Sequence, residues 1–367
     1  MELSEIRKRL DDIDRRLKED FCARLACSGE VAKCKLAEGA GLSRVFDPVR
    51  ESEILARTVE GLPERIARAV RDQFSQILRN SRSLQYLAFS EAGKDGLPRP
   101  EEPAKKSRVL LQGAAGAYQH SAAQTLFPDL PVVFCERFED VFEGLDGESA
   151  GVLPLENSTA GVVGEVFDAL DGHAAFVNGG LELKLAHTLM GLGDPAEVDT
   201  VLAHPQTLRQ CENFLKSRNL RGEPCANNAI AARTVAERKS ARYAALCAET
   251  CAALYGLKIF ERGICDAAGN TTRFIVLGTR FERVAGADKL ALLFRTQNRP
   301  GALSEALAAF SFFGVNVLAL HSRPIKETPF EYRFYAEISG SYEDPVLRAL
   351  LAQLSCELPY FRILGTF

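Results

Sequence analysis

The hydrophobic pattern of this chain changes across residues 91–107, and this change constrains the fold more than any other feature. Before it, apolar residues recur at a spacing of three or four, which is typical of an amphipathic helix. These residues are Leu3, Ile6, Leu10, Ile13, Leu17, Phe21 and Leu25. The segment itself, "EAGKDGLPRPEEPAKKS", is rich in proline and charge, as linkers are. We therefore predict an all-α helical domain over residues 1–90 and a linker over residues 91–107.

Two further domains are expected after the linker. Over residues 108–282, short apolar runs such as "RVLL", "PVVFC" and "AGVLPL" alternate with Ala-rich helical stretches, which predicts an α/β domain with a largely parallel sheet. Residues 288–367 repeat the alternation in the order strand, helix, strand, strand, helix, strand. This order predicts an α+β ferredoxin-like domain. A chain of 367 residues is long enough for two or three domains of about 150 residues each.

Composition narrows the class of function. The net charge of -4 gives no reason to expect a nucleic-acid partner. No apolar run approaches the ~20 residues that a membrane helix needs, and the charged N-terminus has no signal-peptide pattern. The 10 scattered cysteines are consistent with a reducing cytoplasm, and neither they nor the 5 histidines have zinc-site spacing. We expect a cytoplasmic protein with no membrane partner, no metal and no cofactor.

The first helical stretch carries basic residues whose positions can be compared by helix geometry. Arg24 and Lys35 are eleven positions apart, which leaves them about 20° apart around a helix and therefore on one face. Arg7 precedes Arg24 by seventeen positions, or about 25 Å along the axis. One small ligand cannot contact both arginines within a single straight helix. If both bind the same ligand, a second copy of the chain must supply one of them.

The next helix is expected to begin at "FDPVRESEIL", with Asp47 as its N-cap and Pro48 in its first position. Arg50 and Glu51 then lie in its first turn, while Ser81 and Gln85 share a face of a later helix. Taken one at a time, each of these polar residues would more often be a solvated surface residue than a ligand contact.

As a set, these residues resemble the all-helical class of chorismate mutases, in order and nearly in spacing. The set is Arg7, Arg24, Lys35, Asp47, Arg50, Glu51, Ser81 and Gln85. The loop "LAEGAGLSRVF" between Lys35 and Asp47 is a few residues longer than in familiar members. The resemblance implies a domain-swapped dimer and a pericyclic rearrangement of chorismate that needs no nucleophile.

The resemblance also implies a role for each member of the set. Arg7 and Arg24 would bind the substrate carboxylates in bidentate fashion. Lys35 and Gln85 would donate hydrogen bonds to the ether oxygen. Glu51 would accept a hydrogen bond from the ring hydroxyl. Asp47, Arg50 and Ser81 would complete the pocket.

Polar clusters flank several predicted strands of the α/β region, where such sheets bind ligands. "LPLENSTAG" contains Asn157, Ser158 and Thr159, "AHPQ" contains His204 and Gln206, and "NTTRF" contains Thr272 and Arg273. Each cluster alone could be turn chemistry, and His204 alone would more often cap a helix or be buried. A Gly-rich turn, "QGAAGAY", precedes them without the Gly-Lys-Ser/Thr of a phosphate loop.

Together with "LYGLKIFERGI", these motifs resemble prephenate dehydratases over residues 108–280. The resemblance implies a two-lobed, periplasmic-binding-protein-like fold, with Asn157, Ser158, Thr159, His204 and Gln206 lining the cleft. Thr272 would assist departure of the substrate hydroxyl, and Arg273 would hold a carboxylate. One departure is "CANNAIAA", in which Asn227 and Asn228 replace smaller or hydroxyl residues. This departure leaves open whether the substrate is prephenate or arogenate.

The last domain resembles the ACT domains that follow prephenate dehydratases, on the motifs "NRPGALSEAL" and "LHSRP". The resemblance implies binding of phenylalanine as an effector at a dimer interface. The implied contacts are Asn298, Gly301, Ala302, Leu303, Ser322 and Arg323. His321 replaces the usual glutamate of the second motif, which leaves the strength of regulation open. Simple turn chemistry competes with ligand binding at Ser322 and Arg323.

We therefore expect a homodimeric or larger bifunctional enzyme that converts chorismate through prephenate to phenylpyruvate and is inhibited by phenylalanine. Its catalytic residues would be Lys35, Glu51, Gln85 and Thr272. Two alternatives remain at this point. One is an arogenate dehydratase with a vestigial mutase, and the other is a sensor that binds aromatic metabolites without converting them.

Overall fold

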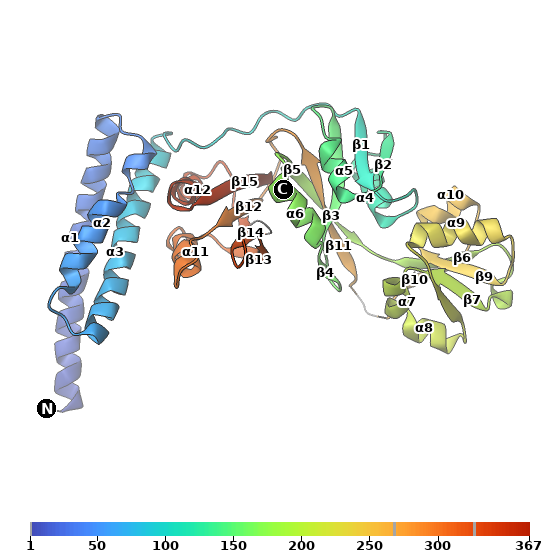
Figure 1. Cartoon of the computed structure of the whole chain (residues 1–367), viewed down its shortest axis with the longest axis horizontal. Coiled ribbons are helices and arrows are strands. Elements are labelled where there is room, and N and C mark those ends of the chain that lie inside the picture. The colour runs from blue at the N-terminus through green and yellow to red at the C-terminus, as the bar shows by residue number, and fades with distance from the viewer. Residues whose placement is uncertain (1, 267–268, 326–327) are drawn as a thin grey trace. The chain divides into compact units, whose positions relative to one another are not determined.

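The structure is a computed structural model that describes residues 2–266, 269–325 and 328–367. It divides into two compact units (Figure 1). Unit 1 consists of Met1–Arg99 with Asp288–Ile363, and unit 2 consists of Pro100–Ala287 with Leu364–Phe367. Each unit is described by itself.

Unit 1 begins with three α-helices and a short 3-10 turn. They are α1 (Leu3–Ala37), η1 (Leu42–Arg44), α2 (Pro48–Val59) and α3 (Glu64–Glu91). The predicted start of α2 is confirmed, because the Asp47 carboxylate accepts a hydrogen bond from the Arg50 backbone N–H at 3.0 Å. No helix in the described part of the chain has both the length and the apolar character needed to cross a membrane.

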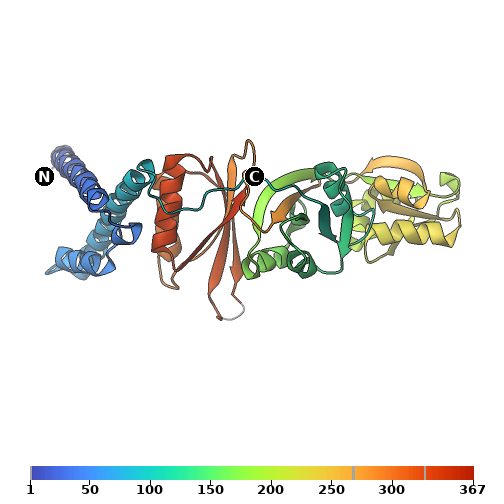
Figure 2. The same cartoon turned by 90° about the horizontal axis from the view of Figure 1, so that it is seen from above.

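The second part of unit 1 contains four strands and two helices. In chain order they are β12 (Lys289–Arg295), α11 (Ala302–Phe312), β13 (Val317–Pro324), β14 (Tyr332–Ser339), α12 (Pro345–Glu357) and β15 (Tyr360–Thr366). The last three residues of β15 belong to unit 2. The strands lie side by side in the order β13, β14, β12, β15. Helix α12 lies between these strands and α3 (Figure 2).

Polar contacts join α12 to α3 and to the segment that follows α3. The Ser83 hydroxyl donates to Gln353 Oε1 at 2.7 Å. Arg348 forms a two-pronged ion pair with Asp95, with Nε–Oδ2 and Nη2–Oδ1 distances of 2.6 and 2.7 Å. Both side chains of this pair are only 3% exposed. The first residues of the predicted linker are thus anchored on α12, because Asp95 is the buried partner of a charge.

Unit 2 contains two sheets with helices packed against them (Figure 1). The first lobe contains β1 (Arg108–Gln112), α4 (Tyr118–Leu126), β2 (Val132–Cys135), α5 (Phe138–Glu143), β3 (Ser149–Asn157), β4 (Gly161–Val162), α6 (Gly164–Gly172), β5 (Phe176–Lys184) and β11 (Thr271–Gly278). The second lobe contains β6 (His187–Gly191), η2 (Pro195–Glu197), β7 (Thr200–Ala203), α7 (Pro205–Gln210), α8 (Glu212–Ser217), β8 (Arg221–Pro224), α9 (Asn228–Arg238), β9 (Tyr243–Cys247), α10 (Thr250–Tyr255) and β10 (Lys258–Ile264). The strand orders are β5, β11, β3, β1, β2 in the first lobe and β10, β6, β9, β7, β8 in the second.

The prediction of a largely parallel sheet is wrong, because both sheets are mixed. β1 runs parallel to β2 and β3, but β11 runs antiparallel to both β3 and β5. In the second lobe, β7 runs parallel to β8 and β9, whereas β6 runs antiparallel to β9 and β10. The physical reason lies in the connections. The chain leaves the first lobe along β5 and returns along β11, and a strand that brings the chain back beside its exit strand must run the opposite way.

This return positions the polar residues of "NTTRF". In the antiparallel register Thr272 lies opposite Asn157 of β3 and Leu183 of β5. The apolar residues that follow, from Phe274 to Leu277, are buried in the sheet. The buried strand therefore holds its polar end against the end of β3.

Candidate active sites

The three N-terminal helices of unit 1 and their connections line an open cavity of about 590 Å³. Its walls include every residue of the predicted mutase set except Arg7. These are Arg24, Lys35, Asp47, Arg50, Glu51, Ser81 and Gln85. They come from α1, from the first turn of α2 with its cap, and from α3, so segments far apart in sequence converge here.

Hydrogen bonds between α1 and α3 orient the donors of this cavity. Lys35 Nζ donates to Gln85 Oε1 at 2.9 Å and to the Arg44 carbonyl at 2.7 Å. Arg24 Nη1 donates to the Ser81 hydroxyl. A lysine, an arginine and an amide therefore face one space, which suits an anionic ligand with a further oxygen acceptor.

The electrostatics of the cavity act on Lys35. Partial burial lowers the pKa of its ammonium group, and the positive charges of Arg44 and Arg50 lower it further. The carboxylate of Asp47 opposes this effect. A bound anion would relieve the repulsion among these cations.

Arg82 also lines this cavity, and it was not among the residues predicted from the sequence. Its guanidinium donates from Nη1 to Glu51 Oε2. From its other edge it donates to Glu357 of α12, with Nε–Oε1 and Nη2–Oε2 distances of 2.7 and 3.0 Å. Arg82 follows Ser81 directly and precedes Gln85 by three positions, so helix spacing could have placed it near them. Its two carboxylate partners are distant in sequence, so no local pattern could have identified them.

Arg7 does not line this cavity, in agreement with the argument from helix length. It lies near the N-terminal end of the 35-residue helix α1. Along this end the apolar stripe is exposed, with Leu3 at 62%, Leu10 at 52% and Leu17 at 60% exposure.

A second polar cluster lies in unit 2, where β3 meets β11. Asn157 Nδ2 donates to Thr272 Oγ1 at 2.9 Å and to Asn270 Oδ1 at 2.8 Å. The side-chain oxygen Oδ1 of Asn157 accepts from the Thr159 hydroxyl at 2.7 Å and from the Thr159 and Ala160 backbone N–H groups at 3.0 Å. Asn157 therefore links the turn after β3 to Thr272, which is only 6% exposed.

Gln210 at the end of α7 joins this cluster to the second lobe. It donates to Thr159 Oγ1 at 2.9 Å and accepts from Asn270 Nδ2 at 3.1 Å. Its Oε1 also lies 3.0 Å from His187 Nε2. Gln210 was not predicted, although it lies one helical turn after Gln206, and this spacing on a common helix face was the available signal.

His187 is buried behind this contact. Burial lowers its pKa, against the opposing effect of its hydrogen bond to Gln210. Its Nδ1 lies 2.6 Å from the Tyr118 hydroxyl, and burial raises the pKa of Tyr118. At neutral pH the pair is therefore uncharged, and it contributes hydrogen bonds without net charge.

Comparison with known proteins identifies the family. The family of prephenate dehydratase matches residues 109–282, and that of chorismate mutase type II matches residues 6–86. A bifunctional chorismate mutase/prephenate dehydratase from Neisseria gonorrhoeae is 30% identical over 90% of this chain and 89% of its own length. The chain belongs to the bifunctional chorismate mutase/prephenate dehydratase family.

Two further relatives bear on the dehydratase region. Arogenate dehydratase/prephenate dehydratase 2 of Arabidopsis thaliana is 33% identical over 71% of this chain and 72% of its own length. The structure of prephenate dehydratase in complex with L-Phe from Arthrobacter aurescens aligns with a TM-score of 0.64 at 25% identity. The alignment covers 71% of this chain and 89% of that one.

The other residues predicted for the dehydratase site have structural contacts of their own. His204 caps α7, with its Nδ1 accepting from the Gln206 backbone N–H at 3.2 Å. Arg273 Nη2 lies 3.0 Å from Glu156 Oε2, so a protein carboxylate already pairs with this guanidinium. The Ser158 hydroxyl donates to the Gly269 carbonyl at 3.0 Å.

The two asparagines that depart from the dehydratase motif have local roles. Asn227 is the N-cap of α9, where its Oδ1 accepts from the Ile230 N–H at 2.7 Å. Asn228 Oδ1 accepts from the His204 backbone N–H at 2.8 Å, and its Nδ2 donates to Thr207 Oγ1 at 2.9 Å. These contacts hold the His204 turn against α9.

The predicted effector residues divide into two groups. Asn298, Gly301, Ala302 and Leu303 line a hollow of about 320 Å³ in unit 1. Gly301 has a φ of 83°, a left-handed conformation that glycine adopts without strain. Ser322 and Arg323 lie on β13, opposite Phe334 and Arg333, and do not line this hollow.

Proposed function

We propose that the cavity between α1, α2 and α3 is the chorismate mutase site and that the cluster at Asn157 and Thr272 is the prephenate dehydratase site. The chain would thus convert chorismate to prephenate and then to phenylpyruvate. The observation that carries the proposal is the convergence of Arg24, Lys35, Glu51 and Gln85 on one cavity. Such a set suits a dicarboxylate whose ether oxygen gains negative charge.

At the mutase site the protein would act by holding the substrate and by electrostatic stabilisation. A pericyclic rearrangement needs a compact substrate conformer more than it needs a nucleophile. Arg24 would bind a carboxylate, and Lys35 and Gln85 would donate to the ether oxygen as its charge develops. Glu51, whose carboxylate is paired with Arg82, would accept from the ring hydroxyl.

At the dehydratase site the substrate would lose carbon dioxide and a hydroxyl group together, driven by aromatisation. Thr272 Oγ1 already accepts from Asn157 Nδ2, so its own proton is free to point at a substrate hydroxyl. A threonine is a weak acid, and we propose that it relays or orients a proton. The Arg273–Glu156 pair would have to open or share its guanidinium if Arg273 binds a carboxylate.

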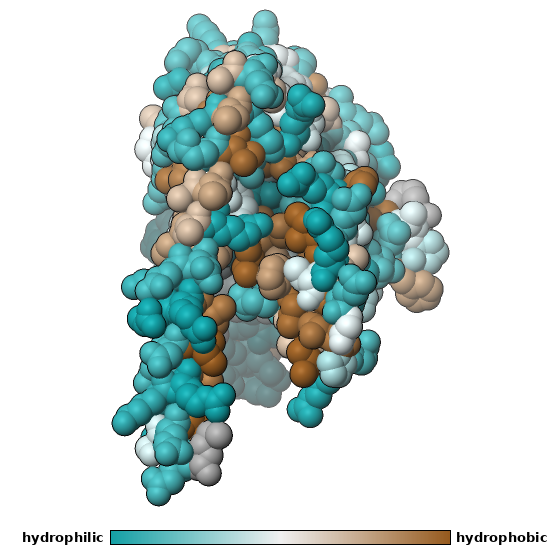
Figure 3. Space-filling view, turned by 90° about the vertical axis from the view of Figure 1, so that its left-hand side faces the viewer, coloured by the Kyte–Doolittle hydropathy of each residue, from teal (hydrophilic) through white to brown (hydrophobic). Residues whose placement is uncertain are grey.

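The assembly we propose is a homodimer in which α1 extends into a second copy. The exposed apolar stripe from Leu3 to Leu17 supports this arrangement, because an apolar helix face of this length is normally covered. Figure 3 looks onto the helical end of unit 1, where apolar residues gather in a hollow between polar ridges. Within one copy, Arg7 and Arg24 are about 25 Å apart along α1. Burying the stripe against a second copy would bring Arg7 of one copy toward the mutase cavity of the other.

We further propose that residues 288–367 form a ferredoxin-like ACT domain that binds phenylalanine, and that unit 2 has periplasmic-binding-protein-like lobes. The strand order β13, β14, β12, β15 with both helices in a βαββαβ sequence supports the first assignment. The hollow at Asn298 and Gly301 supports an effector site. Feedback inhibition of this chain is part of the proposal.

The deciding experiment gives the purified chain chorismate alone and follows chorismate, prephenate and phenylpyruvate by chromatography. We expect phenylpyruvate to appear after transient prephenate. Accumulation of prephenate would leave the mutase assignment and point to arogenate as the second substrate. Unchanged chorismate would refute the mutase assignment and favour a sensor.

A further inference from the structure

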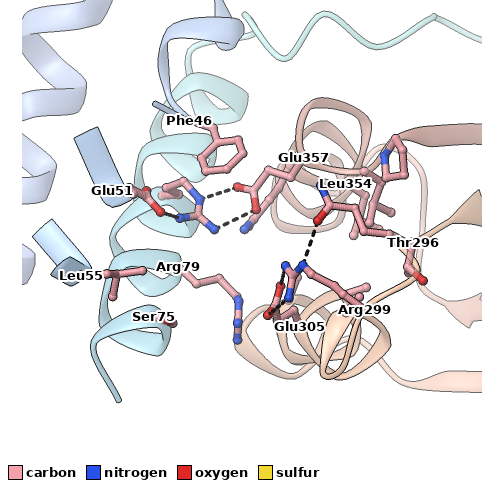
Figure 4. Close-up of a pocket in the computed structure, with 18 of the residues that line it drawn as sticks. Phe46, Glu51, Leu55, Ser75, Arg79, Thr296, Arg299, Glu305, Leu354 and Glu357 are labelled. Carbon is pink, nitrogen blue, oxygen red and sulfur yellow. Dashed lines mark hydrogen bonds and ion pairs between the residues drawn. The ribbon is translucent and has the colours of Figure 1, made fainter. Parts of the chain in front are cut away.

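A second cavity in unit 1, of about 430 Å³, lies between α3 and the helices α11 and α12 (Figure 4). It is separate from the mutase cavity but shares a wall with it, because Glu51 and Arg82 line both. None of the residues predicted for the effector site lines it except Ala302. Its volume lies in the range of ordinary small-molecule sites.

The α3 wall of this cavity carries a stripe of arginines. Arg71, Ser75, Arg79 and Arg82 follow one another at spacings of four, four and three, which places them on one helix face. The Ser75 hydroxyl is engaged, because it donates to the Arg71 carbonyl at 2.8 Å. The charge of the wall comes from its three guanidinium groups, and the net charge depends on which of them is paired with a carboxylate of the protein.

Most of the charges in the cavity are neutralised within the protein. Arg82 is paired with Glu51 and Glu357. Arg299 is paired with Glu305, with an Nη1–Oε1 distance of 2.7 Å. Each of the three carboxylates of the cavity therefore already has a guanidinium partner.

Arg79 differs from Arg82, the other buried arginine of this wall. Its side chain is 8% exposed and reaches into the cavity toward Arg299 and Glu305 (Figure 4). Among the described residues its one hydrogen-bond acceptor is the neutral amide of Gln76, at 2.7 Å from Nη1, and no carboxylate lies within ion-pair distance. The carboxylates of Glu305 and Glu357 act on Arg79 only from a longer distance, and they are already paired with Arg299 and Arg82. A buried charge without an ion-pair partner of its own is costly to the fold.

A second buried donor lines the same cavity. Gln353 is 1% exposed, and its Oε1 accepts from Ser83, but its Nε2 has no hydrogen-bond partner among the described residues. The remaining walls are partly apolar and include Leu55, Ala306 and Leu354. Arg71 also has no ion pair among the described residues, but it is exposed to solvent, so Arg79 is the buried unpaired cation of the cavity. This buried cation, one buried amide donor without a partner and the apolar walls together define a site for a single negative charge on an apolar body.

We propose that this cavity binds a small organic monocarboxylate, with the carboxylate on Arg79 and the apolar part against Leu55, Ala306 and Leu354. The ligand supplies the ion-pair partner that Arg79 lacks among the described residues. It lies across the Arg82–Glu51 ion pair from the mutase cavity. The proposal concerns binding alone and does not depend on either proposed activity.

The test is calorimetric titration of the full chain with phenylacetate, and with phenylacetamide as the neutral analogue of the same shape. The titrations are repeated on Arg24→Met, which removes an anion contact of the mutase cavity. We expect phenylacetate to bind at a site that Arg24→Met retains, and phenylacetamide to bind that site at least tenfold more weakly. Arg79→Met should remove this site or weaken it at least tenfold, as expected for losing a charged hydrogen bond.

Two further variants separate the role of Arg79 from effects on folding. Arg71→Met removes an exposed guanidinium from the same helix face and should change the affinity less than about twofold, since an exposed charge contributes little. Ser75→Phe fills the cavity and leaves Arg79 in place, and it should also abolish the site. Equal binding of phenylacetate and phenylacetamide, or binding unchanged in both Arg79→Met and Ser75→Phe, would overturn the proposal. Absence of any saturable site for phenylacetate in the wild-type chain would overturn it as well.

Discussion

Replacing Thr272 by valine tests the dehydratase assignment most directly. Valine has nearly the shape of threonine and suits a β-strand, so the substitution removes a hydroxyl and little else. The hydroxyl accepts one hydrogen bond, from Asn157 Nδ2 at 2.9 Å. Asn157 Nδ2 keeps Asn270 Oδ1 at 2.8 Å as a second acceptor, so the loss of stability should be only about 1 kcal/mol.

The expected loss of activity is much larger than this loss of stability. A positioned proton donor contributes roughly 10²- to 10⁴-fold to rate, and a weak acid such as threonine should fall near the lower limit. We therefore expect kcat for phenylpyruvate formation from prephenate to fall about 10²-fold, which corresponds to ~2.7 kcal/mol of activation free energy. Chorismate consumption should be unchanged.

The assay follows phenylpyruvate formation under saturating prephenate, with thermal melts of each variant. Thr271→Val is the matched control, because it makes the same substitution on the opposite face of the same strand, where the hydroxyl donates only to the Gly269 carbonyl at 3.3 Å. Thr272→Ser should retain most of the activity. A Thr272→Val enzyme within about threefold of wild type would remove the hydroxyl from the mechanism, since a contribution that small is below the range of acid catalysis.

Three further predictions concern unit 1. Arg24→Ala should abolish chorismate turnover and leave prephenate turnover unchanged, and an equal loss of both activities would indicate one shared site. The pKa of Lys35 is lowered from its ordinary value of 10.5 by burial and by neighbouring cations. As the pH rises, mutase kcat/KM should therefore fall with a midpoint below pH 10.5, because the ammonium group loses its proton. Lys35→Arg should have no such alkaline limb, because a guanidinium stays protonated, and an unchanged profile would exclude Lys35 as the titrating group. Arg348→Met should lower the free energy of unfolding in urea by about 3–5 kcal/mol because it leaves Asp95 buried and unpaired, whereas the double variant with Asp95→Leu should recover most of this loss.

Local sequence signals predicted the helical parts of the chain well. The Asp47 cap and Pro48 were sufficient to locate the start of α2, because a helix start is decided by a few neighbouring backbone N–H groups. The separation of Arg7 from Arg24 also followed from helix rise alone. In contrast, the direction of β11 was not predicted, because strand direction depends on where the chain returns after a whole lobe.

The same distinction holds within the sites. Ser81 and Gln85 could be placed on one face from their spacing, and the order of the motifs indicated the family. The partners of Arg82 could not be predicted, because Glu51 and Glu357 are brought to it by the packing of α2 and α12 on α3. Arg273 has a carboxylate partner in Glu156 that the motif "NTTRF" does not reveal.

The sequence by itself determined the helical period, the helix caps and the chemical types of residue available for each reaction. These follow from interactions within a few positions along the chain, where spacing fixes geometry. Only the tertiary structure decided which charges are neutralised and which are left for a ligand. That outcome depends on distances between helices and strands that are far apart in sequence. Arg79 and Arg82 illustrate it, since they lie one turn apart on α3 and only Arg82 has carboxylate partners within the described chain.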